Sequence, residues 1–166
     1  INSDTQYTEI LTRAGQAYLL IGNAQQADLA FGAAMKLKPG DKEVATAVAL
    51  RDLEKGRASE ALLALRTIAE QDSGISADLA RVSAQFRSRD YSAALVAIDR
   101  LQAKQPTSPT PSHLRGEALR YKGDKVGARA AYEEALKRAP SYFSPIAALV
   151  GMYLAERDFL GARRRL

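Results

Sequence analysis

Apolar residues recur at steps of three and four along most of the chain, as at Ala27, Phe31 and Ala34. This spacing places one apolar stripe on one face of an α-helix, whereas a strand needs alternation at every second residue. The same stripe returns much later at Ala128, Tyr132 and Ala135. The pattern therefore predicts a chain of amphipathic helices that contains a repeated sequence unit.

The repeat has a nearly constant period. Five turn positions follow one another at intervals of 34, 33, 34 and 34 residues: Gly22, Gly56, Arg89, Gly123 and Arg157. An alanine stands five residues after each turn: Ala27, Ala61, Ala94, Ala128 and Ala162. In the four complete units, a large apolar residue stands nine residues after the turn: Phe31, Leu65, Ile98 and Tyr132. Self-similarity at such a period indicates stacked supersecondary units.

Each position in the unit has a physical role. Glycine tolerates the positive φ of a tight turn between two helices. Small alanines let the helices approach closely, and the large residue fills the space beyond them. Proline at 39, 106 and 140 ends the second helix, because the residue before a proline is pushed out of the α region. Each unit is thus a helical hairpin that completes its core by stacking on its neighbours.

The first half of the unit carries the resemblance to a known family. Leu11, Ala14, Gly15 and Tyr18 recur as Leu79, Val82, Ser83 and Phe86, and as Ile146, Leu149, Val150 and Tyr153. Together with the turn glycine, the alanines and the closing proline, this pattern resembles the tetratricopeptide repeat. The resemblance implies an all-α solenoid of stacked antiparallel helical hairpins with about 4.5 repeats. It predicts one array over residues 1–166, read as a fragment of a longer protein, with repeats at 8–41, 42–74, 75–108, 109–142 and, in part, 143–166.

Several positions depart from the repeat. Asp52 replaces the aromatic residue and Ser73 replaces the proline of the second unit, so that unit is expected to be less regular. In the third unit the first-helix pattern lies one residue nearer the turn. The proline-rich entry to the fourth unit predicts a stiff link, after which Thr110 or Ser112 caps the helix.

Two segments, "ADLARVSAQFRSRDYSAALVAIDRLQAKQP" and "LRGEALRYKGDKVGARAAYEEALKRAPSYFSPIAAL", carry a narrower resemblance. They are similar to the repeat lipoproteins of bacterial exosortase (PEP-CTERM) systems. This resemblance implies an envelope assembly for exopolysaccharide production or protein sorting. It predicts a periplasmic or outer-membrane-attached location, with the cytoplasm as the alternative.

The composition argues against catalysis. The chain has no cysteine and one histidine, His113, so thiol chemistry and the usual zinc sites lack their ligands. Ser112 next to His113 does not make a nucleophile–base pair, because adjacent residues on a helix point apart. We therefore expect no enzyme activity, no cofactor and no metal, and no segment is apolar enough to span a bilayer.

The net charge of +5 lies in the final third of the chain. From Pro111 onward, eleven Lys and Arg residues face six acidic residues. This excess suggests an alternative function, the binding of an acidic polysaccharide or nucleic acid. The other interpretation is an ordinary solvated face of the helices.

The family resemblance implies a groove lined by the first helices of the repeats. Carried onto this chain, its ligand-facing positions are Thr12, Gln16, Leu20, Leu50, Glu54, Arg87, His113, Glu117, Arg120 and Tyr121, with Gly151 and Leu154 in the last unit. A peptide or helix of a protein partner is the predicted ligand. The leucines could instead pack against neighbouring helices, and His113 could simply begin its helix. Self-association through an apolar edge is a third possibility.

Overall fold

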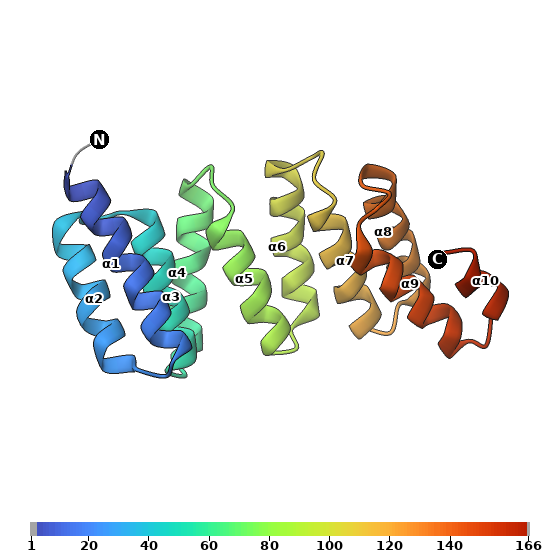
Figure 1. Ribbon diagram of the computed structural model, residues 1–166, viewed down its shortest axis with the longest axis horizontal. Helices are drawn as coiled ribbons and strands as arrows, with labels where there is room; N and C mark the ends of the chain where they lie inside the picture. The colour runs from blue at the N-terminus through green and yellow to red at the C-terminus, as the bar shows by residue number, and fades with distance from the viewer. Residues whose placement is uncertain (1–2, 166) are drawn as a thin grey trace. The chain divides into compact units, whose positions relative to one another are not determined.

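The computed structural model describes residues 3–165. This part of the chain forms ten helices and no strand, as the sequence predicts (Figure 1). The helices are α1 (Ser3–Leu20), α2 (Ala24–Leu37), α3 (Lys42–Glu54), α4 (Ala58–Gln71), α5 (Ser76–Arg87), α6 (Tyr91–Lys104), α7 (Thr110–Tyr121), α8 (Lys125–Arg138), α9 (Phe143–Ala155) and α10 (Phe159–Arg163). None of them is both long and apolar enough to cross a membrane.

The chain divides into two compact units, Ile1–Ala84 and Gln85–Leu166. In the first unit α1 packs on α2 and α3 packs on α4, and in the second α7 packs on α8 and α9 on α10. The partners of each pair are consecutive and antiparallel (Figure 1). These are the helical hairpins predicted from the repeat. The extension of one array over residues 1–166 stays a prediction.

The predicted turns adopt the backbone conformation that the repeat requires. Gly22, Gly56 and Gly123 have φ of 74°, 80° and 87°, and Arg89 and Arg157 have φ of 60° and 61°. All five turn positions therefore lie in the left-handed region, which glycine enters freely and arginine does not.

The second helix of each complete unit is equally long. Helices α2, α4, α6 and α8 each contain 14 residues. Lys38, Gln105 and Ala139 leave the helical region immediately before Pro39, Pro106 and Pro140. Helix α4 ends at the same point without a proline, since Asp72 adopts an extended conformation. The expected irregularity of the second unit is thus absent from this helix.

Side-chain caps begin α2, α6, α8 and α10, whereas α4 has none. Asn23, Asp90, Asp124 and Asp158 each accept a hydrogen bond from the backbone N–H three residues later, which satisfies one free donor of the first turn. The prediction that Thr110 or Ser112 caps α7 is wrong. Pro109 holds the N-cap position of α7, and the Ser112 side chain is buried next to Gln102 and Arg138.

One large residue fills the core of each hairpin. Phe31 and Tyr132 are fully buried, and each packs against a glycine of the preceding helix. A Cβ on Gly15 would lie 2.5 Å from the Phe31 ring, and one on Gly116 would lie 2.4 Å from the Tyr132 ring. These glycines are needed because the backbone approaches the ring too closely for any side chain.

The third repeat corrects one part of the sequence alignment. Val82 and Gln85 are buried, whereas Ser83 is exposed and Phe86 is half-buried. The buried positions are therefore counted back from the turn at Arg89, as in the other repeats. Counted in this way, Gln85 and not Phe86 stands at the position of Tyr18, and Phe86 contacts Tyr91 and Tyr121.

Candidate functional site

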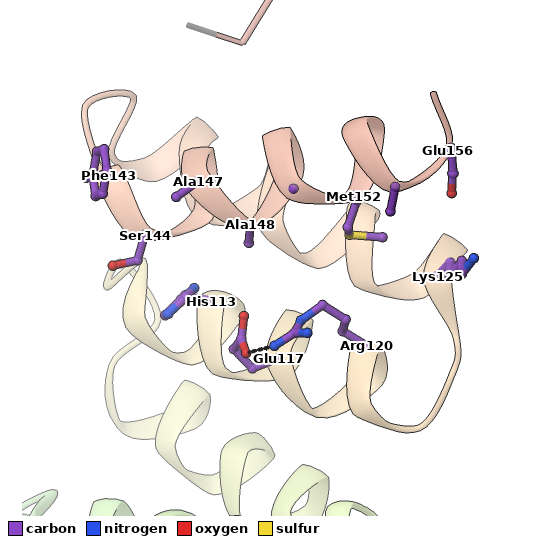
Figure 2. Close-up of a pocket in the computed structure, with 12 residues that line it drawn as sticks. His113, Glu117, Arg120, Lys125, Phe143, Ser144, Ala147, Ala148, Met152 and Glu156 are labelled. Carbon is purple, nitrogen blue, oxygen red and sulfur yellow. Dashed lines mark hydrogen bonds and ion pairs between the residues drawn. The ribbon is translucent and has the colours of Figure 1, made fainter. Parts of the chain in front are cut away.

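A cavity of about 800 Å³ lies between α7 and α9 in the second unit (Figure 2). Helix α7 contributes His113, Glu117 and Arg120 to one wall (Figure 2). These residues lie on one face of the helix because they follow one another at steps of four and three. The opposite wall belongs to α9. The complete lining is His113, Glu117, Arg120, Lys125, Phe143, Ser144, Ala147, Ala148, Gly151, Met152, Ala155 and Glu156.

An ion pair organises the α7 wall. Arg120 Nη2 lies 2.6 Å from Glu117 Oε2, and Tyr132 Oη donates a hydrogen bond of 2.5 Å to Glu117 Oε1. Both carboxylate oxygens of Glu117 are thus occupied by protein donors. Because Tyr132 belongs to the hairpin core, the core holds this ion pair in place.

The same contacts shift three pKa values. Burial acts to raise the pKa of Glu117, but the hydrogen bonds from Arg120 and Tyr132 outweigh burial and the pKa falls below its ordinary value. The hydrogen bond to Glu117 raises the pKa of Arg120. Burial and the same carboxylate raise the pKa of Tyr132. At neutral pH the wall therefore carries a charged pair and a neutral phenol.

The third residue of the α7 wall, His113, has a buried polar atom, Nδ1, without a hydrogen-bond partner among residues 3–165. Its ring centroid lies 5.3 Å from that of Tyr142 and 5.9 Å from that of Tyr132. Burial lowers the pKa of His113, although the charge of Glu117 opposes this. The imidazole is therefore neutral at neutral pH.

The α9 wall is apolar and open. Ala147, Gly151 and Ala155 are exposed at steps of four residues, so they form a strip of small residues along the helix. Phe143, at the start of the strip, is 76% exposed. Met152 closes the inner side and is buried. A cavity with one largely apolar wall and one polar wall whose Glu117 and Arg120 are paired with each other is suited to binding.

The structure separates the ten residues predicted to line a groove. The cavity brings together His113, Glu117 and Arg120, along with Gly151. Arg87 and Tyr121 line another cleft of the second unit. The residues from the first unit line neither of these two cavities. Gln16, Leu20 and Glu54 are exposed there.

Two of the predicted residues, Thr12 and Leu50, make contacts within the first unit. Thr12 is only 1% exposed and donates its hydroxyl to the carbonyl oxygen of Thr8. Leu50 packs against the core of the first unit, as the alternative interpretation of the leucines anticipates. Thr12 therefore offers no contact surface in this conformation, whereas Leu50 is half-buried.

Most of the cavity lining from α9 was missed by the sequence analysis. Gly151 was included, but Phe143, Ala147 and Ala155 were not, and the predicted residue Leu154 does not line the cavity. A signal for these residues exists in the sequence, where small residues recur at steps of four along an otherwise apolar helix.

About half of the basic residues in the final third are held in ion pairs, although the segment keeps its net positive charge. Six of its eleven Lys and Arg residues pair with carboxylates: Arg115, Arg120, Arg129, Lys137, Arg138 and Arg165. Asp124 and Asp158 act as helix caps. Among the described residues, no group of three or more His, Asp or Glu residues could hold a metal ion.

Comparisons with known proteins agree with this architecture. Residues 8–41 and 112–142 match the family model of the tetratricopeptide repeat. No curated protein matches the chain significantly.

Several solved structures share the fold. Pseudomonas aeruginosa PilF has a TM-score of 0.80 at 17% identity, over 99% of this chain and 75% of its own. PilW, a widely conserved type IV pilus biogenesis factor, has a TM-score of 0.78 at 14% identity, over 98% and 76%. MamA from Desulfovibrio magneticus RS-1 has a TM-score of 0.72 at 15% identity, over 96% and 90%.

Two segments of the chain are thus tetratricopeptide repeats, and the chain has the fold of tetratricopeptide repeat proteins. The matches do not extend to the lipoproteins of exosortase systems, and that resemblance stays a prediction.

Proposed function

We propose that this chain is a non-enzymatic protein-interaction scaffold that binds a segment of a partner in the cavity between α7 and α9. One observation carries the proposal. His113, Glu117, Arg120 and Gly151, which the family resemblance places in the ligand groove, line a single cavity of about 800 Å³ with an exposed apolar wall. Helix-in-groove recognition uses such a wall to bury the apolar face of a partner helix.

The walls define the chemistry of the partner segment. Ala147, Gly151 and Ala155 allow the partner's backbone to approach closely, and Phe143 offers a large apolar contact. Glu117 and Arg120 already satisfy each other, so the partner does not need a matching charge at this point. We therefore propose an amphipathic helix as the ligand, with its apolar face on α9.

A steric block tests this site. Helical peptides can be selected by display on the immobilised protein, and the Gly151→Arg variant is then tested for their capture. Nothing lies within 4 Å of a Cβ at Gly151 or at Gly32, so a side chain can be added to either helix without a clash at its Cβ. We expect Gly151→Arg to abolish capture, whereas Gly32→Arg, in α2, serves as the control and retains it. Equal capture by both variants would exclude the cavity.

We further propose that the scaffold works in a bacterial envelope assembly. The support is the sequence resemblance to exosortase-associated lipoproteins, together with the shared fold of PilW, a pilus biogenesis factor. Fractionation of the native cells should recover the protein with the periplasm or the membranes. Recovery in the cytosol would contradict this location.

A further inference from the structure

A second cleft of about 660 Å³ lies at the other end of α7 and is lined by Phe86, Arg87, Arg89, Tyr91 and Tyr121. These residues come from the end of α5, the following turn, the start of α6 and the end of α7. We refer to them as the aromatic–arginine cleft. All of them belong to the second unit.

The three aromatic rings form one cluster. Tyr91 and Tyr121 are stacked, with ring centroids 5.2 Å apart and an interplanar angle of 10°. Phe86 meets both of them edge-on, with centroids 5.7 Å and 6.2 Å apart. Tyr121 is nevertheless 53% exposed. The cluster therefore presents a rigid aromatic surface to solvent.

The charge around this surface is positive. Arg87 and Arg89 are exposed, and no ion pair involves either of them within residues 3–165. Lys122, next to Tyr121 in the chain, donates a hydrogen bond to the hydroxyl of Ser92 beside Tyr91. Asp90, the nearest acid in the sequence, caps α6 and does not line the cleft. An anionic ligand is electrostatically complementary to this positively charged surface.

Arg89 occupies its position at an energetic disadvantage. Its φ of 60° lies in the left-handed region, where three of the five repeats have glycine. Arg157 has the same conformation at a turn outside the cleft, so Arg89 matters to the cleft through its charge and not through its backbone.

We propose that the aromatic–arginine cleft is a second protein-binding site, which takes an acidic peptide segment with an aromatic side chain at its centre. The aromatic side chain packs on the Phe86, Tyr91 and Tyr121 rings, and flanking carboxylates pair with Arg87 and Arg89. Aromatic ring edges carry partial positive charge, so they add to the attraction for an anionic segment.

A peptide explains the cleft better than a nucleic acid does. Bases bind by stacking on open ring faces. The Tyr121 ring is already stacked on Tyr91, and the Arg120 guanidinium lies 4.4 Å from its centroid. Little of either face is left for a base, whereas the outer edges remain accessible to a side chain.

A fluorescent probe peptide tests the proposal. The protein contains no tryptophan, so the emission of an acetylated and amidated Asp-Glu-Trp-Asp-Glu peptide reports binding without background. We expect saturable binding that is stronger than that of Gln-Asn-Trp-Asn-Gln. Asp-Glu-Ala-Asp-Glu should compete only weakly. Preference for the neutral peptide, or displacement of the probe by oligothymidylate at a lower concentration than by the tryptophan-free peptide Asp-Glu-Phe-Asp-Glu, would overturn the proposal.

A matched pair of variants separates binding from folding. Arg89→Gly removes a cleft charge at a position whose backbone favours glycine, so affinity should fall about threefold to fivefold with no loss of thermal stability. Arg157→Gly makes the same change at a turn outside the cleft and should leave affinity unaltered. Tyr121→Ala should weaken binding about tenfold. Unchanged affinity in Arg89→Gly and Tyr121→Ala would refute the site.

Probe binding at the aromatic–arginine cleft can be distinguished from binding in the cavity between α7 and α9. Gly151→Arg blocks that cavity and should leave binding of the acidic probe intact. Loss of probe binding in Gly151→Arg would assign the probe to the first cavity and overturn the second site.

Discussion

At the residue scale, Glu117 links the hairpin core to the candidate site. One of its oxygens accepts a hydrogen bond from Tyr132, which is fully buried, and the other pairs with Arg120 at the cavity wall. Gly116, the residue before Glu117, makes room for the Tyr132 ring. The helix packing at Gly116, the hairpin core and the ion pair of the cavity wall therefore all depend on the position of the Tyr132 ring.

Gly116→Ala should destabilise the protein. A Cβ at this position would lie 2.4 Å from the Tyr132 ring, and overpacking of this kind costs about 1–3 kcal/mol. Gly32→Ala is the matched control, because a Cβ there meets nothing within 4 Å and alanine favours a helix by up to about 1 kcal/mol over glycine. Urea denaturation should show opposite signs for the two variants. A stabilising Gly116→Ala would mean that the ring moves aside freely.

Stability should also fall as the pH is lowered through the range in which His113 titrates. Burial lowers the pKa of His113 in the folded state, so the unfolded chain binds a proton first, below about pH 6.5. One such group lowers the free energy of unfolding by at most about 1.4 kcal/mol per pH unit.

The assignment can be made because His113 is the only histidine in the chain. Denaturation of His113→Gln over the same pH range should lose this slope. The pKa of Glu117 is also lowered, but its contribution disappears only at more acidic pH, below its ordinary value of 4.5. A slope that persists in His113→Gln would point to another group.

At the element scale, the five inter-helix turns are alike in conformation and unlike in sequence. Gly22, Gly56 and Gly123 meet the requirement for positive φ, while Arg89 and Arg157 meet it under strain. The aspartate that follows each arginine caps the next helix. The cap and the surrounding helices therefore hold the turn without glycine.

Arg157→Gly should stabilise the protein. The left-handed conformation costs a non-glycine residue about 1–2 kcal/mol, and glycine removes this cost. Glycine also raises the conformational entropy of the unfolded chain, which cancels part of the gain in stability. We expect a net increase of up to about 1 kcal/mol in the free energy of unfolding, measured by chemical denaturation. Gly123→Ala, at the equivalent turn, should have the opposite effect, and equal signs would contradict the argument.

At the scale of the whole molecule, each compact unit has its own core. Phe31 packs with Ala27 and Ala47 in the first unit, and Tyr132 packs with Ala128 and Leu149 in the second. Repeat proteins gain stability from each repeat and its immediate neighbours. A defect in one core should therefore act mainly on its own unit.

Phe31→Ala should show this division. Truncation of a buried aromatic residue costs about 3–5 kcal/mol, and hydrogen exchange should lose protection mainly in residues 3–84. Residues 85–165 should keep most of theirs. A uniform loss across both ranges would mean that the chain unfolds as a single cooperative body.

The repeat itself was determined by the sequence. The period, the turn positions, the closing prolines and the alanine contacts all follow from interactions within one hairpin or between neighbours. Such short-range constraints leave a regular trace in the order of residues. The helices, the positive φ at all five turns and the burial of Phe31 and Tyr132 accordingly agree with prediction.

The functional surfaces depended on the tertiary structure. A family alignment placed His113, Glu117 and Arg120 in a groove, but not Phe143 and Ala147 opposite them, because a cavity depends on the separation of two helices. It placed Thr12 there as well, although Thr12 is buried. Phe86, which the alignment paired with Tyr18, instead joins Tyr91 and Tyr121. Net charge likewise did not reveal that six of eleven basic residues are paired. Periodicity records which face of a helix is buried, whereas a binding surface is made by side chains from separate helices that only folding brings together.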